Sequence, residues 1–258
     1  MLAFFRKIRK ALLGSGQTRK YVLYAIGEIA LVVIGILIAL QINNWNDNRI
    51  NIEKERVYLE RLHTDLSADS TSLSSRKHLS HRENEGYRSF LRRAYITQNS
   101  LEEFSELWGL LWVSSLQLTI QNSTYLELVS TGQLDIITND KLKVSLLNLY
   151  KQYEEVGNHM SEFNEYSASI LTELARRNAS LKFYPPNLAL FEDDQLDGNR
   201  EWEWINDPST PEFKIAVEVA VTYYRKHEIF IGYFDELLLE VGNILGMIQE
   251  EIGKPRSL

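Results

Sequence analysis

The stretch YVLYAIGEIALVVIGILIALQI, residues 21–42, decides the fold of this chain, and Glu28 is its only charged residue. At a rise of about 1.5 Å per residue, a helix over these positions is roughly 33 Å long. That length is sufficient to cross a hydrocarbon layer of about 30 Å. The stretch therefore predicts a membrane-spanning helix, with the lipid bilayer as its surroundings.

The charges that flank this span predict its orientation. Six basic residues and no acidic residue precede it: Arg6, Lys7, Arg9, Lys10, Arg19 and Lys20. After the span, Asp47 and Glu53 are mixed with Arg49 and Lys54. By the positive-inside rule, we expect the amino terminus in the cytoplasm and the chain beyond Trp45 on the other side of the membrane.

Three parts follow from this orientation. They are a basic cytoplasmic head over residues 1–19, a transmembrane signal anchor over residues 20–44 and a periplasmic domain over residues 45–258, all attached to the inner membrane. A cleaved signal peptide is the alternative. Its apolar region is expected to have about 7 to 15 residues and to end at a small-x-small site. Here a longer run is followed by Asn43 and Asn44, which favours an uncleaved anchor.

The composition predicts a folded domain behind the anchor. Removing the six basic residues of the head from the 28 in the chain leaves 22, against 35 acidic residues, so the remainder carries a net charge of −13. Such a surface disfavours nucleic acid as a partner, because phosphates attract a basic face. The absence of cysteine excludes disulfides, thiolate metal sites and cysteine nucleophiles.

The hydrophobic periodicity predicts that one helix leaves the membrane without a break. A seven-residue spacing begins inside the span and continues beyond it, at Leu31, Ile38, Trp45, Ile52, Leu59, Leu66 and Leu73. The partner positions of this heptad are polar at Asn48, Glu55 and Asp69, with Leu62 as the exception. An isolated coiled coil needs apolar residues at both positions, so we expect this helix to pack against later helices of the same chain.

Two long amphipathic helices are expected later in the chain. The first follows from apolar spacing at Leu142, Leu146, Leu149, Tyr153, Val156, Met160, Phe163, Ser167, Ile170 and Leu174, with one polar member. The second follows from Phe213, Val217, Ala220, Tyr224, His227, Ile231, Phe234, Leu238, Val241, Leu245, Ile248 and Ile252. Asn139 is the expected cap of the first helix, and Thr210 with Pro211 begins the second.

Two shorter helices are expected between the helix that leaves the membrane and Leu142. Ser100 with Glu103 predicts a capping box that opens a helix over residues 101–113. Thr124 with Glu127 predicts a second capping box, and Gly132 the end of that helix. The fold class is therefore all-α, with an N-terminal transmembrane helix that continues into an antiparallel extracytoplasmic helical bundle.

Two blocks of sequence carry a resemblance to a known family. The first runs from Lys20 through Ala25-Ile26-Gly27-Glu28-Ile29 to Ile38-Ala39-Leu40-Gln41-Ile42-Asn43-Asn44-Trp45. The second comprises Tyr125, Leu128, Ser130, Gly132, Leu134, Ile137, Asn139 and Leu142. Both blocks resemble a family of small single-span proteins of Gram-negative bacteria whose function is unknown. The resemblance implies a membrane protein with an extracytoplasmic helical domain, and it brings no catalytic residue or cofactor.

Glu28 is the sharpest candidate for a functional residue, because an ionisable group in a span costs about 2.5 to 3.5 kcal/mol on insertion scales. It shares one helix face with Leu31, Gly35 and Ala39. Small residues four apart let two helices approach closely, so this membrane seam is expected to bind a second copy or another membrane protein. The alternative is that Glu28 extends toward the cytoplasmic head groups.

Metal and histidine sites are weaker candidates. His78 and His81 lie one helical turn apart with Glu85 beyond them, but a solvated face explains that spacing as well. Asp193 and Asp197 match the opening of a calcium loop, although its twelfth position is Trp204 where a glutamate is required. We therefore expect no metal and no cofactor. His227 falls in an apolar seam, as a hydrogen-bonded core histidine would.

Three functional classes remain open. The first, which we favour, is a non-enzymatic, membrane-anchored interaction or sensor-like module that passes its signal to a partner in the membrane, since only about twenty residues precede the span. The second is a single-span subunit of an ion-driven complex, with Glu28 as the protonatable group. The third is an envelope enzyme without a recognisable motif.

Overall fold

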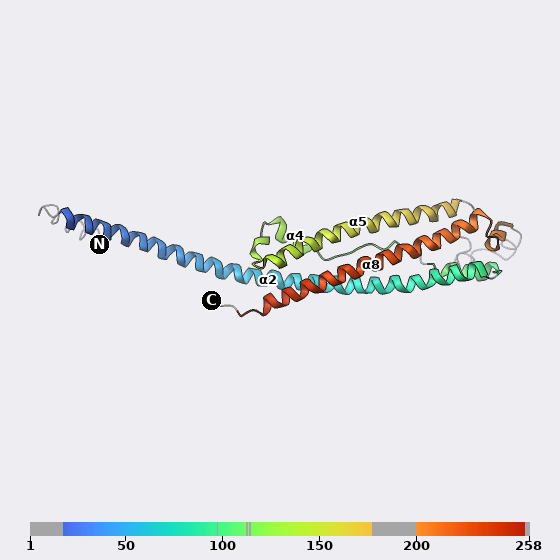
Figure 1. The fold of residues 1–258 in the computed structure, drawn as a ribbon, viewed down its shortest axis with the longest axis horizontal. Helices are drawn as coiled ribbons and strands as arrows, with labels where there is room; N and C mark the ends of the chain where they lie inside the picture. Colours follow the sequence, from blue (N-terminus) through green and yellow to red (C-terminus); the bar gives the residue numbers. More distant parts are fainter. Residues whose placement is uncertain (1–17, 97, 112, 114, 177–199, 256–258) are drawn as a thin grey trace. The chain divides into compact units, whose positions relative to one another are not determined.

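The computed structural model describes residues 18–96, 98–111, 113, 115–176 and 200–255. Within these ranges every regular element is helical, which confirms the all-α class (Figure 1). The elements are α2 (Thr18–Ile96), α3 (Leu101–Gly109), α4 (Ser123–Ser130), η1 (Leu134–Ile136), α5 (Asp140–Arg176), η3 (Arg200–Asn206) and α8 (Pro211–Gly253). The unbroken helix expected from the seven-residue spacing is present as α2.

The chain divides into two compact units. The first comprises Met1–Val57 and Arg256–Leu258, and the second comprises Tyr58–Pro255. In the first unit, every residue from Ile29 to Trp45 is exposed. By length and composition, one helix of the described residues is apolar enough to cross a membrane, and none of its apolar window is buried.

Three long helical segments pack together in the second unit. Helix α8 runs antiparallel to α2, because Lys77 pairs with Asp235 and Arg88 with Tyr224. It also runs antiparallel to α5, since His159 lies at Tyr233 and Asn164 at Lys226. Helices α2 and α5 therefore run in the same direction, and the antiparallel relation expected of the helices holds only for α8 with each of them.

An extended segment explains why α2 and α5 share a direction. After α3, residues 115–121 return along the helices without regular structure. Their backbone is held by side chains of the long helices: Asn164 donates to the Leu116 carbonyl at 2.8 Å, and Asp69 accepts the Gln121 N–H at 2.7 Å. The helix expected to reach Val113 ends earlier, at Gly109, ahead of this segment.

Most of the residues expected to begin or end a helix do so. Ser100 and Glu103 form both hydrogen bonds of a capping box, and Thr210 accepts the Phe213 N–H ahead of Pro211. Gly132 adopts φ +66° after α4, and the neighbouring Gln133 N–H bonds back to the Leu128 carbonyl at 2.8 Å. This left-handed residue completes a Schellman motif, which favours glycine.

The capping box expected at Thr124 is wrong. Helix α4 begins at Ser123, two residues earlier than this cap implies, and its N-cap residue Asn122 makes no side-chain cap. The Thr124 hydroxyl instead donates to Asp65 at 2.6 Å, and Glu127 accepts hydrogen bonds from Tyr58 and Arg61. Both side chains of the expected box therefore attach α4 to α2, because tertiary partners replace the local backbone.

Helix α8 contributes two neighbouring stripes of side chains to the core. The expected stripe is only half-buried at alternate members, such as Tyr224 and Ile231. A neighbouring stripe is buried throughout and comprises Ala216, Val219, Tyr223, Lys226, Phe230, Leu237 and Ile244. Helix α8 contacts both α2 and α5, so it needs a wider buried face than one apolar stripe supplies.

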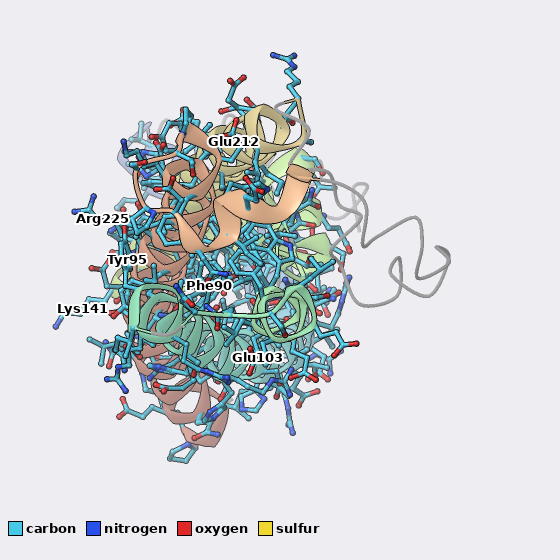
Figure 2. All side chains as sticks on the ribbon, turned by 90° about the vertical axis from the view of Figure 1, so that its right-hand side faces the viewer. Phe90, Tyr95, Glu103, Lys141, Glu212 and Arg225 are labelled. Carbon is cyan, nitrogen blue, oxygen red and sulfur yellow. The ribbon has the colours of Figure 1, made fainter. Side chains whose placement is uncertain are left out.

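Aromatic side chains fill the core around α3. Phe90 on α2 meets Phe104 and Trp108 edge-on, each with ring centroids 5.7 Å apart, and Figure 2 shows Phe90 in the interior. Trp204 of η3 packs edge-on against Phe104 at 5.4 Å. Edge-to-face pairs of this kind are worth about 0.5–1.5 kcal/mol beyond the area they bury. Trp204 thereby attaches η3 to α3.

Candidate functional site

A group of polar side chains is enclosed where α2, α5 and α8 meet. We call it the polar core cluster. Its members, each buried, are Ser80, Glu83 and Asn84 of α2, Asn164 and Ser167 of α5, and Lys226 and His227 of α8. Buried charges are costly unless they are paired, so a cluster of this composition in an otherwise apolar core marks a candidate site.

His227 and Glu83 face one another across the α2–α8 contact. The His227 Nε2 atom lies 3.1 Å from Glu83 Oε2, with His227 fully buried and Glu83 nearly so. Neither of these two atoms makes a hydrogen bond with a described residue. Burial and, to a smaller extent, the charge of Lys226 lower the pKa of His227 to about 3. The imidazole is therefore neutral at pH 7.

Lys226 brings a cation into the same space from the next position of α8. Its Nζ donates to Asn164 Oδ1 at 3.3 Å and lies 4.0 Å from the ring centroid of Tyr223. Burial lowers the pKa of Lys226 to about 8, while Glu83 acts in the opposite direction. Burial raises the pKa of Glu83, opposed by the charge of Lys226 and then of Arg82. The carboxyl group and the ammonium group therefore partly compensate each other.

Several polar atoms of the cluster are left without hydrogen bonds. Within the described part of the chain these buried atoms are Ser80 Oγ, Glu83 Oε2, Asn84 Oδ1 and both ring nitrogens of His227. Asn84 still donates through Nδ2 to Glu228 Oε1 at 2.6 Å. Because almost all buried polar atoms in proteins have partners, these atoms support the cluster as a candidate site.

The sequence did not predict this cluster as a site. Histidine 227 was expected as a hydrogen-bonded core residue, whereas its ring nitrogens make no hydrogen bond among the described residues. No sequence pattern indicated that Lys226 is buried, because it lies outside the apolar stripe expected on this helix. The one available hint was the pair Lys226-His227 between apolar residues of a long helix.

The membrane seam is open at its two small residues, Gly35 and Ala39, in the part of the chain that the structure describes. Leu31 is 74% exposed, and Ala39 is exposed as well. A Cβ atom added at Gly35 would meet nothing within 4 Å. Glu28 is half-buried on the same helix. Space for a second helix is therefore open at Gly35.

The metal candidates are not assembled into a site. His78, His81 and Glu85 are exposed, and Glu85 pairs with Arg88 at 3.1 Å. Among the residues that the structure describes, no three His, Asp or Glu side chains could hold a metal ion. Asp193 and Asp197 lie outside the described residues.

Comparison with known proteins gives one match. A family model described as a family of unknown function, DUF6090, matches residues 28–170, more than half of the chain. The match contains Glu28, Gly35, Glu83 and Asn164, whereas helix α8 lies beyond it. No curated protein and no solved structure matches the chain.

Proposed function

Because the chain belongs to the DUF6090 family, whose function is unknown, we propose its role from its own architecture. It is a non-enzymatic, membrane-anchored interaction or sensor-like module, with the second unit outside the cytoplasm. The apolar residues of α2 between Val22 and Ile42 cross the membrane, and the residues of that helix from Tyr58 onward pack in the second unit.

The exposed apolar surface of α2 is the observation that carries this proposal. Ile29, Leu31 and Ile42 are each more than 60% exposed, and the intervening apolar side chains are exposed with them. Soluble proteins rarely expose contiguous apolar patches above a few hundred Å². A bilayer would cover this surface along its whole length, and the six basic residues before it favour a cytoplasmic amino terminus.

The membrane seam gives this module a means to bind its partner. Glu28, Leu31, Gly35 and Ala39 share one face, where small residues allow close helix approach and the carboxyl group gains from a hydrogen-bond donor on the partner. The partner is a second copy of the chain or another membrane protein. Substitution Gly35→Leu fills the groove and keeps the span apolar.

An assay of helix association in bacterial membranes tests the seam. Gly35→Leu should lower association of the span, whereas the matched control Ile36→Leu, on another face, should leave it unchanged. Both variants should insert into the membrane as the wild type does. Equal association for the two variants would show that the seam does not bind a partner. Contact with the lipid head groups would then explain Glu28.

A second candidate function rests on Glu28 itself. A carboxyl group within a span is the expected proton carrier of an ion-driven complex. In vesicles reconstituted with the protein and its captured membrane partner, Glu28→Gln should abolish proton uptake if the chain is such a subunit. A seam residue should tolerate the same substitution, because glutamine keeps the shape and the hydrogen-bonding capacity.

A further inference from the structure

Helices α5 and α8 form a groove of about 560 Å³ on the surface of the second unit. Phe163 and Tyr166 line it from α5, and Ile229 is among the lining residues of α8. Ligand pockets in proteins commonly have volumes of about 300–1,000 Å³. The groove is therefore large enough for a small organic molecule with one apolar substituent.

Charges of both signs line the groove on α8. Arg225 and Lys226 supply the cations, and Glu218 and Glu228 supply the carboxylates. Arg225 is exposed, and Figure 2 shows its side chain projecting outward from the helices. Among the described residues, no ion pair joins Arg225 to either carboxylate. Arg225 and Glu228 lie three residues apart, one helical turn, and can therefore bind one ligand together.

Lys226 extends the positive end of the groove into the core. It is only 2% exposed, and it belongs to the polar core cluster. Asn84 of the same cluster holds one oxygen of Glu228 at 2.6 Å. A ligand between Arg225 and Glu228 would therefore contact side chains that are connected to α2 and α5 as well as α8.

We propose that this groove binds a small zwitterion with an aromatic or branched apolar substituent. The carboxylate of the ligand pairs with Arg225, its ammonium group pairs with Glu228, and its substituent packs against Phe163 and Ile229. This inference rests on the sensor-like role proposed above, and it names the class of ligand for that role. Charge-assisted hydrogen bonds at both ends select the zwitterion over molecules that carry only one of its charges.

Three probes of equal apolar size test the proposal by calorimetry on the full-length protein in lipid nanodiscs. They are L-phenylalanine, phenethylamine, which lacks the carboxylate, and 3-phenylpropanoate, which lacks the ammonium group. Empty nanodiscs correct for partition into lipid. L-Phenylalanine should bind about tenfold more tightly than either of the others, the effect of one charged hydrogen bond. Equal affinity for the three probes, or no saturable binding of L-phenylalanine, would overturn the proposal.

Two substitutions assign each charge to its residue. Arg225→Gln should weaken L-phenylalanine binding about tenfold and leave phenethylamine unchanged. Glu228→Gln, which still accepts a hydrogen bond from Asn84, should weaken L-phenylalanine and leave 3-phenylpropanoate unchanged. Arg92→Gln, an exposed arginine of α2 outside the groove, is the matched control. An equal loss of L-phenylalanine affinity with Arg92→Gln would refute the site. That result would leave the proposed role untouched, because association of the span is measured in a separate assay.

Discussion

Among single residues, His227 contributes to the response of the second unit to acid. The structure keeps the imidazole neutral beside a carboxyl group in the core, with Lys226 adding a positive charge nearby. A histidine with a lowered pKa in the folded state stabilises the fold above its unfolded pKa, and this stabilisation is lost as the pH falls toward the folded value.

The first prediction concerns this histidine. Between pH 7 and pH 5 the unfolded chain protonates His227, with an ordinary pKa of about 6.5, whereas the folded chain does so only near pH 3. The free energy of unfolding of the wild type should therefore fall by about 2 kcal/mol relative to His227→Gln over this range. Urea denaturation of the detergent-solubilised chain, followed by circular dichroism, measures the difference. Parallel pH profiles of the two proteins would contradict the assignment.

Gly86 gives the second prediction. A Cβ atom at this position of α2 would lie 2.3 Å from the carbonyl oxygen of Leu110, at the end of α3. Gly86→Ala should therefore lower the free energy of unfolding by about 1–3 kcal/mol, because the backbone of α3 must move.

A matched glycine substitution controls for helix propensity. A Cβ atom added at Gly157 of α5 meets nothing within 4 Å. Gly157→Ala should raise the free energy of unfolding by about 0.5–1 kcal/mol, since alanine favours the helix. Thermal unfolding of both variants compares the effects, and a stabilising Gly86→Ala would show that α3 does not pack closely on α2.

At the scale of elements, the sequence predicted long helices well and their packing only in part. Residues of α5 such as Leu146, Tyr153 and Met160 were expected in the core and are buried. Periodicity predicts one buried stripe per helix, so it did not reveal that α8 packs on two sides and buries Lys226. The return of residues 115–121 was also not predicted, because Asp69 and Asn164, which hold it, are distant in sequence.

The third prediction tests how this return is held. Asp69 Oδ1 accepts the Gln121 N–H at 2.7 Å, and its Oδ2 accepts the Tyr153 hydroxyl at 3.2 Å. Burial raises the pKa of Asp69, and these two hydrogen bonds oppose that rise. Asp69→Leu leaves both donors buried without an acceptor, so the free energy of unfolding should fall by about 2–4 kcal/mol.

Asp69→Asn is the conservative control for this substitution. It keeps one carbonyl acceptor at the same place, so it should lose roughly half of that stability or less. Urea denaturation compares the two variants with the wild type. Equal losses would show that the charge of Asp69, and not its acceptor atoms, holds the return segment.

For the molecule as a whole, the proposed role depends on the membrane. The family match begins at Glu28, inside the apolar stretch, ends at residue 170 of α5, and gives no role. The membrane seam and the zwitterion groove serve the proposed sensor-like role only if the span crosses the bilayer and the second unit lies beyond it. The charge asymmetry around residues 21–42 predicts that arrangement.

A pair of reporter fusions tests whether the second unit lies outside the cytoplasm. Two reporters are each fused after Leu258. Alkaline phosphatase is active only outside the cytoplasm, and green fluorescent protein fluoresces only if it stays inside the cytoplasm. We expect high phosphatase activity and no fluorescence, with both fusions recovered in the membrane fraction. Fluorescence without phosphatase activity would contradict the orientation, and recovery of either fusion in the soluble fraction would contradict the anchor.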